Sequence, residues 1–132
     1  MVHPTVDAWH NVARTRDIAA LDALLADEAV FHSPVVHTPQ AGRALTRTYL
    51  AAAFEVFFND SFRYVREVVG EHDAVLEFEV EIDGISVNGV DMIRWDDRGR
   101  IVDFKVMIRP LKAIEVVHRR MAAMLQAGRP AR

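Results

Sequence analysis

The sequence predicts a single α+β domain, and the order of its segments carries that prediction. The first 58 residues hold three stretches whose apolar residues recur at helical spacing. Four strand-like runs follow, at residues 62–69, 74–82, 87–95 and 100–108, and short links rich in turn-forming residues join them. Links of this length predict antiparallel hairpins. Helices followed by an antiparallel meander are typical of the α+β class.

Local signals mark where the first elements begin. We expect Thr5 to cap a first helix and Asp17 to cap a second, because side chains of these types accept hydrogen bonds from the first backbone N–H groups of a helix. A short strand is expected over residues 29–33. A turn at residues 39–42 then precedes a third helix over residues 43–58.

The C-terminal segment predicts one more amphipathic helix. Apolar residues recur at helical spacing from Leu111 to Leu125. Gly128 and Pro130 follow, and both residue types commonly lie just beyond the end of a helix. No repeat and no low-complexity stretch divides the chain, so residues 1–132 are expected to form one domain.

Composition restricts the classes of function. The chain has 132 residues and no cysteine, which excludes disulfides and a thiol nucleophile. Its 16 basic and 19 acidic residues give a net charge of −3, and no basic patch predicts nucleic-acid binding. No segment has the pattern of a signal peptide or the length of a membrane span. We therefore expect a cytoplasmic protein without a membrane or nucleic-acid partner.

Asp91 is the most informative residue, because it stands where a strand is otherwise expected to be apolar. In the run 87–95, Asp91 shares one face with Ile93 and Trp95. If that face points into the concave side of the sheet, Asp91 is a carboxyl group among apolar residues, and burial raises its pKa. A shift of one residue in phase would instead place Asp91 on the outer, charged face.

The other face of the meander is rich in charged residues. Its expected cross-strand partners are three glutamates and three basic residues: Glu77, Glu79 and Glu81 against Lys105, Arg109 and Arg94. Val90 and Met92 lie on the same face, so a second subunit is expected to cover part of it. This pattern predicts a homodimer formed through the outer face of the sheet.

Several local strings, taken in order, resemble a known superfamily. These are residues 16–21, 24–31, Ser33-Pro34, Gly42-Arg43 and residues 99–102. In their order and spacing they resemble the nuclear transport factor 2-like superfamily, in its branch of SnoaL-like polyketide cyclases and ketosteroid isomerases, over about residues 5–112. The resemblance implies a cone-shaped barrel, in which a strongly curved sheet wraps around the helices and leaves an apolar pocket at its open end. It also implies that homodimers are common.

The resemblance carries over to the site only in part. Ser33 stands where ketosteroid isomerases have an aspartate base, and a serine cannot replace a carboxylate as a proton carrier. Trp9 aligns with the tyrosine of their oxyanion hole, and Asp91 matches the acid that completes it. Asp91 is the expected hydrogen-bond partner of a buried tryptophan N–H. One of three family residues is therefore retained.

Strand alternation and the resemblance together predict that Asp91 is the catalytic group. They also give a set of residues expected to line a pocket around it. These residues come from the first and third helices, from the strands, and from the loop after the first strand. The set is Trp9, Phe31, Ser33, His37, Tyr49, Phe78, Ile93, Trp95, Phe104 and Ile108. No spacing of histidines and carboxylates predicts a metal site, and no motif implies a cofactor.

Three functions fit these residues. In the first, an enzyme of the isomerase, cyclase or hydratase type acts on an apolar, cyclic or carbonyl-bearing molecule. Asp91 then acts as acid or oxyanion donor, assisted by Trp9 or Tyr49, and His37 or His10 supplies the base. In the second, the cone binds an apolar metabolite without converting it. In the third, aromatic side chains fill the cone and the protein is an interaction module.

Overall fold

A computed structural model describes residues 3–127 of the chain. Four helices and six strands occur in this part of the chain. In order they are α1 (Pro4–Thr15), α2 (Ile18–Leu24), β1 (Leu25–His32), β2 (Gln40–Ala41), α3 (Arg43–Phe57), β3 (Arg63–Val69), β4 (Asp73–Ile82), β5 (Ile85–Trp95), β6 (Ile101–Arg109) and α4 (Leu111–Ala127). The predicted α+β class is confirmed, while Gly128 and Pro130 lie outside the described residues.

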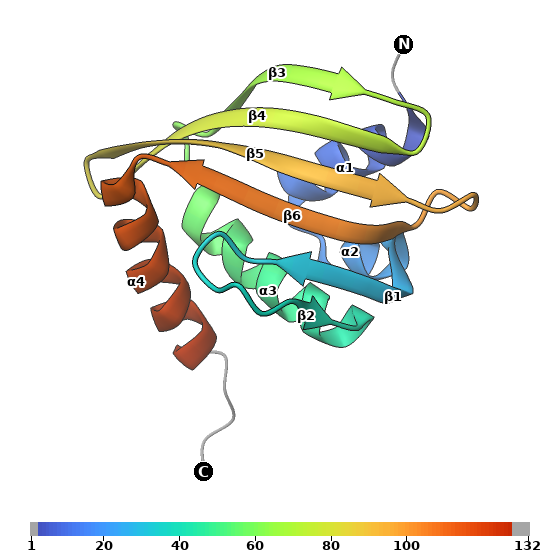
Figure 1. The fold of residues 1–132 in the computed structure, drawn as a ribbon, viewed down its shortest axis with the longest axis horizontal. Coiled ribbons are helices and arrows are strands. Elements are labelled where there is room, and N and C mark those ends of the chain that lie inside the picture. The colour runs from blue at the N-terminus through green and yellow to red at the C-terminus, as the bar shows by residue number, and fades with distance from the viewer. Residues whose placement is uncertain (1–2, 128–132) are drawn as a thin grey trace.

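The six strands form one curved sheet in the order β2-β1-β6-β5-β4-β3 (Figure 1). Strands β3 to β6 are the predicted antiparallel meander. Strand β1 pairs with β6 in parallel, so the sheet is mixed rather than wholly antiparallel. The reason is topological, because α3 and four strands lie between β1 and β6 in the chain and no hairpin joins them. The two edge strands, β2 and β3, do not pair with each other, so the sheet of the described residues stays open.

The helices cover the concave side of the sheet, and the core lies between the two layers. Figure 1 shows α1, α2 and α3 on one side of the strands and α4 at the end where β4 turns into β5. Trp9, Leu21 and Phe54 from the helices are fully buried against Phe78 and Phe104 from the sheet. No helix among residues 3–127 is both long and apolar enough to cross a membrane.

The sequence predicts the N-cap of the second helix correctly but not that of the first. Asp17 caps α2 as predicted, accepting a hydrogen bond from the backbone N–H of Ala20. The first cap is His3 and not Thr5, because Nδ1 of His3 accepts from the Thr5 N–H at 3.1 Å. Pro4 occupies the first turn, where its missing N–H costs nothing. The Thr5 hydroxyl instead donates to the carbonyl of Gly99 at 2.9 Å.

Strand β1 begins earlier than the predicted residue 29. Helix α2 ends at Leu24, and the chain enters β1 at once, with Leu25 buried beside Ile101 of β6. The register then shifts between Leu25 and Val30. Asp27 and Glu28 lie in this irregular part and are exposed, which explains how two carboxylates fit within a strand.

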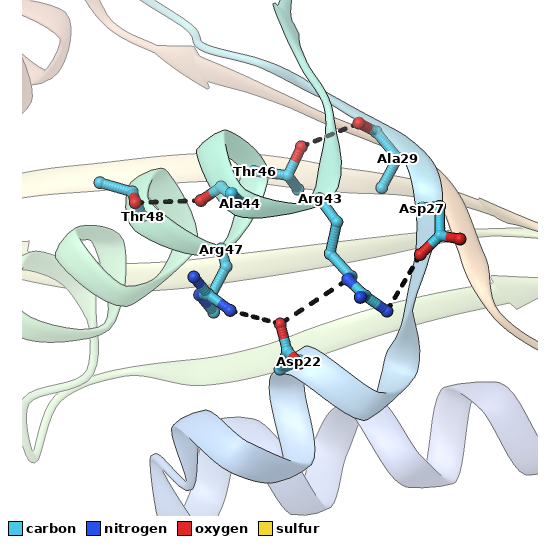
Figure 2. A network of polar contacts seen from close by, with 8 residues as sticks. All are labelled: Asp22, Asp27, Ala29, Arg43, Ala44, Thr46, Arg47 and Thr48. Atoms are coloured by element: carbon cyan, nitrogen blue, oxygen red, sulfur yellow. Dashed lines mark hydrogen bonds and ion pairs between the residues drawn. The ribbon is translucent and has the colours of Figure 1, made fainter.

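The start of α3 is fixed by contacts to α2 and β1 (Figure 2). The buried Thr46 donates its hydroxyl hydrogen to the carbonyl of Ala29 at 3.1 Å. Arg47 reaches Asp22 of α2 at 2.6 Å, and Arg43 lies 3.2 Å from Asp27 of β1. The ion pairs are partly exposed and contribute little each, so Thr46 is the contact that holds the helix to the strand.

On the outer face of the sheet, the glutamates have different partners from those predicted. Glu77 pairs with Arg66 and Glu79 with Arg63, each at 2.9 Å. Strand order explains the correction, because β4 lies between β3 and β5 and its outward-facing acids meet the arginines of β3. Lys105 and Arg94 instead lie opposite Met92 and Asp103 along the β5–β6 ladder.

We predict that Thr46→Val lowers the free energy of unfolding by about 1 kcal/mol, the usual contribution of one hydrogen bond. The substitution keeps the approximate volume of the side chain and removes the hydroxyl that bonds to the carbonyl of Ala29 and, at a longer distance, to that of Gln40. Urea unfolding followed by circular dichroism measures the change. Thr48→Val is the matched control, since the exposed Thr48 bonds only within its own helix, to Ala44. Equal effects of the two variants would contradict the prediction.

Candidate functional site

Asp91 lies in the middle of β5 and points into the cone. It is opposite Leu76 of β4 and Val106 of β6, and only 6% of it is exposed. Ile93 and Trp95 on the same face are buried, whereas Met92 and Arg94 on the other face are exposed. The inward phase predicted from strand alternation is therefore confirmed, and the alternative outer-face position is wrong.

A chain of two hydrogen bonds holds the carboxyl group. The indole Nε1–H of Trp9, from α1, donates to the Tyr64 hydroxyl oxygen at 2.9 Å. The hydroxyl of Tyr64, from β3, donates in turn to Oδ2 of Asp91 at 2.6 Å. The direct bond expected between Trp9 and Asp91 is thus replaced by one through Tyr64. Sequence reasoning did not select Tyr64, although it follows Phe62 at strand spacing in a correctly predicted strand.

Burial sets the protonation of both groups in this chain. Removal of Asp91 from water raises its pKa to about 7, although the hydrogen bond from Tyr64 favours the carboxylate and lowers it. Burial first, and then the charge of Asp91, raises the pKa of Tyr64 well above its usual value. Near neutral pH, Tyr64 is therefore a neutral donor, while Asp91 exists in both charged and neutral forms.

Asp91 is the one charged side chain on the wall of a small aromatic cavity. Its volume of about 30 Å³ suffices for one or two water molecules. The wall comprises Trp9, Leu50, Ala53, Phe54, Phe57, Phe58, Phe62, Phe78, Asp91, Phe104 and Val106. The hydrogen bond from Tyr64 is made to Oδ2 of Asp91, and no hydrogen bond within residues 3–127 is made to Oδ1.

A glycine makes room for part of this wall. Gly89 lies two residues before Asp91 on the same face of β5 and opposite Phe78. A Cβ atom at this position would come within 2.6 Å of both the Phe78 ring and the Met107 carbonyl. The absence of a side chain lets the aromatic ring lie over the strand, beside the acid.

A wider groove lies outside the cavity, between α1, the end of α3 and β3. Its volume is about 350 Å³. Phe58 and Phe62 line both the groove and the cavity, and Tyr64 lines the groove while its hydroxyl contacts Asp91. These three aromatic side chains therefore separate the buried carboxyl from solvent, and a ligand that reaches Asp91 from this side has to displace them.

Of the predicted pocket residues, Trp9, Phe78 and Phe104 lie on the cavity wall with Asp91. The others lie elsewhere. Phe31 does not line the cavity; its ring centroid lies 5.7 Å from that of Tyr49 and 6.2 Å from that of Phe104. Tyr49 itself borders a groove between α3 and α4.

The remaining predicted residues have local roles. Ser33 accepts a hydrogen bond from the N–H of Val35 at 3.1 Å, and His37 is exposed in the loop that follows. Trp95 lies at the far end of β5 and donates its Nε1–H to the Glu71 carbonyl at 3.2 Å. Ile93 is buried in the core, and Ile108 is half-buried opposite Gly89.

No histidine lines the aromatic cavity formed by the described residues. His10 borders the outer groove, where its Nε2 lies 2.5 Å from Glu67 and its ring meets the edge of Tyr64. His32 pairs with Asp103 at 2.8 Å. Neither His10 nor His37 is positioned as a base beside Asp91. Residues 3–127 also contain no group of three histidine or carboxylate side chains that could hold a metal ion.

Comparison with known proteins places this geometry in a family. The profile of the SnoaL-like domain matches residues 6–104. The structure is similar to that of a steroid delta-isomerase from Pseudomonas aeruginosa, with 38% identity, a TM-score of 0.88, and coverage of 93% of this chain and 90% of the other. It is also similar to an uncharacterised cystatin-like protein from Silicibacter pomeroyi, with 30% identity, a TM-score of 0.89, and coverage of 96% and 89%.

More distant structures share the fold alone. A putative polyketide cyclase from Sinorhizobium meliloti is 17% identical, with a TM-score of 0.65 and coverage of 80% of this chain and 95% of the other. No curated protein matches the sequence. The chain belongs to the SnoaL-like family, within the group of nuclear transport factor 2-like folds that includes ketosteroid isomerases and polyketide cyclases.

We predict that Tyr64→Phe raises the pKa of Asp91 above its value of about 7, because the hydrogen bond from Tyr64 favours the carboxylate. Carbon-13 NMR of the labelled aspartate carboxyls, recorded across the pH range, measures the shift. Tyr49→Phe removes the other tyrosine hydroxyl of the chain, away from Asp91, and serves as the control. An unchanged titration in Tyr64→Phe would show that this bond does not set the protonation of the acid.

Proposed function

We propose that this protein is a cofactor-independent isomerase or cyclase that acts on an apolar, cyclic or carbonyl-bearing metabolite, with Asp91 as its acid–base group. One observation carries the proposal, namely a carboxyl group with a pKa of about 7 on the wall of an aromatic cavity. A group that titrates near neutral pH can both take and return a proton in one turnover. Similarity to a structure described as a steroid delta-isomerase, at 38% identity, supports the same class.

The chemistry requires only the groups on the cavity wall. The Asp91 carboxylate takes a proton from a carbon next to the substrate carbonyl, and the electron pair of that C–H bond moves onto the carbonyl oxygen as an enolate. Asp91, now neutral, returns the proton to a different carbon, which completes an isomerisation. In a cyclisation the enolate carbon instead attacks a second carbonyl, and Asp91 gives its proton to the new alkoxide. Tyr64 keeps Oδ2 bonded and leaves Oδ1 to exchange the proton.

This assignment removes the need for a separate base. Ser33 occupies the position of the family aspartate and bonds to its own loop, and no histidine reaches the cavity. Asp91 therefore serves in both directions of proton transfer. The Trp9 N–H and the Tyr64 hydroxyl are already used within the hydrogen-bond chain, so they support the acid rather than contact the substrate.

Binding of an apolar molecule without conversion is the second candidate. The small volume of the cavity and the serine at position 33 favour it. In that case Asp91 only orients the ligand by one hydrogen bond, as isolated polar groups do in apolar pockets. The third function, a wholly filled cone, fits less well, because some space remains beside the carboxyl.

The proposed reaction predicts a loss of activity in Asp91→Asn. With a β,γ-unsaturated 3-ketosteroid as the probe, we expect kcat to fall by about 10²- to 10⁴-fold, the usual contribution of a positioned acid or base. The kcat/KM of the unmodified protein should rise as the pH passes through about 7, because the carboxylate is the form that takes the first proton. Ultraviolet absorption of the conjugated product measures both.

His37→Gln is the matched control, since this side chain is exposed and away from the cavity. An unchanged rate in Asp91→Asn would remove Asp91 from the mechanism. Saturable binding of the probe without turnover would establish the second candidate in place of the first.

We also propose a homodimer through the outer face of the sheet. Val68 and Met107 are 62% and 51% exposed there, and Val75 and Met92 lie between them on β4 and β5. Apolar residues gathered on one face favour burial by a second copy of the same chain.

Met107→Glu is expected to convert the dimer to a monomer, because a carboxylate would lose its hydration in the interface. Size-exclusion chromatography with light scattering measures the mass, and circular dichroism shows that the fold is kept. Leu111→Glu, at a position that is 69% exposed on α4, is the control. A monomeric parent protein would refute the proposed dimer.

A further inference from the structure

The outer groove that leads toward Asp91 is lined by more positive than negative side chains. Arginines come from α1, from the residue after it, and from the start of β3, and one carboxylate faces them. The charged residues of this lining are Arg14, Arg16, Arg63 and Asp60, and His10 lies among them. A groove of about 350 Å³ with this lining is polar and basic, in contrast to the aromatic cavity next to it.

The arginines are only weakly neutralised by the protein itself. Arg14 bonds to the neutral Asn11 side chain at 2.6 Å and forms no ion pair within residues 3–127. Arg63 pairs with Glu79 on the surface, with side chains that are 69% and 46% exposed, and such a pair exchanges readily for a ligand.

Arg16 and Asp60 complete the charge balance of the groove. Arg16 donates to the Phe58 carbonyl and lies 4.0 Å from Glu55, so it is held at the groove wall. Asp60 is exposed in the turn after α3. Arg16 and Arg63 each lie beside a glutamate outside the lining, so among the described residues Arg14 is the arginine of the groove that no acid pairs with. His10 lies beside Glu67.

The groove and the cavity are adjacent, and together they lead from solvent toward Asp91. They share Phe58 and Phe62, and Tyr64 extends from the groove wall to the Asp91 carboxyl. A molecule whose apolar part displaces these rings would therefore have its remaining part beside the arginines. Guanidinium groups bind carboxylate and phosphate oxygens with paired, charge-assisted hydrogen bonds.

From this arrangement we infer that the substrate carries an anionic group, a carboxylate or a phosphate, that binds Arg14 and Arg63 while its apolar part enters the cavity. The inference rests on the proposed function of the cavity and specifies the class of its substrate as an amphipathic anion. It also gives the groove a role in specificity, because the same charges disfavour a cationic amine at this position.

A matched series of ligands tests the inference. We propose calorimetric titration with ω-phenylalkanoates, from phenylacetate to phenylhexanoate, each compared with its neutral amide and with the corresponding alkyl phosphate. The best anion should bind about tenfold more tightly than its amide, a difference that high salt reduces. The preferred anion, carboxylate or phosphate, identifies the group that the groove selects.

Variants then locate the preference in the groove. Arg14→Gln combined with Arg63→Gln should remove the advantage of the anion and leave the affinity for the amide unchanged, which also shows that the cavity is intact. Arg119→Gln combined with Arg120→Gln makes the same change of charge on α4, at two exposed residues outside the groove, and should keep the preference.

The outcomes separate this inference from the proposed function. Equal affinity for anion and amide, or a preference that survives the double variant, would overturn the inference and leave the cavity as a binding site. No binding of any member of the series would overturn the proposed apolar binding site, and the inference with it.

Discussion

The site depends on one hydrogen bond inside an apolar cone, between the Tyr64 hydroxyl and the Asp91 carboxyl. The two residues come from strands that are separated by β4, and the Trp9 indole from α1 completes the contact. The bond therefore ties the helical layer to the sheet at the point where the carboxyl leaves water. Without it, the acid would have apolar neighbours alone and an even stronger preference for its neutral form.

Strand alternation was sufficient to predict the inward position of Asp91, because the neighbouring runs give the phase of the sheet independently. Sequence signals also located α3 and the four strands of the meander to within two residues. These elements have strong periodicity and short links, which are local properties that a sequence displays directly.

Features that depend on non-local packing were harder to predict. Tyr64 has the spacing of an ordinary core residue, and only the curvature of the sheet brings its hydroxyl to Asp91. No local sequence signal predicts the parallel pairing of β1 with β6, since the two strands are distant in the chain. The expected partners of Glu77 and Glu79 were wrong because the pairing depended on which strand lies at the edge.

The set of expected pocket residues is larger than the set that borders the cavity beside Asp91. Trp9, Phe78 and Phe104 line the cavity, whereas Trp95 at the end of β5 contacts the ring of His3 instead. Facing inward is a necessary property of a pocket residue, but most inward residues of a small domain pack against one another. The distance along each strand decides which of them borders the remaining space.

The burial of Asp91 also has a thermodynamic consequence for the whole domain. Its pKa is about 7 in the folded chain and near the ordinary value of 3.8 when the chain is unfolded. Between these two values the native state holds a proton that the unfolded state releases, so the free energy of unfolding decreases as pH rises across this interval. Asp91 therefore stabilises the folded state least in the alkaline range, where its carboxylate is fully formed. Between pH 3.8 and 7, folding is accompanied by uptake of a proton at Asp91.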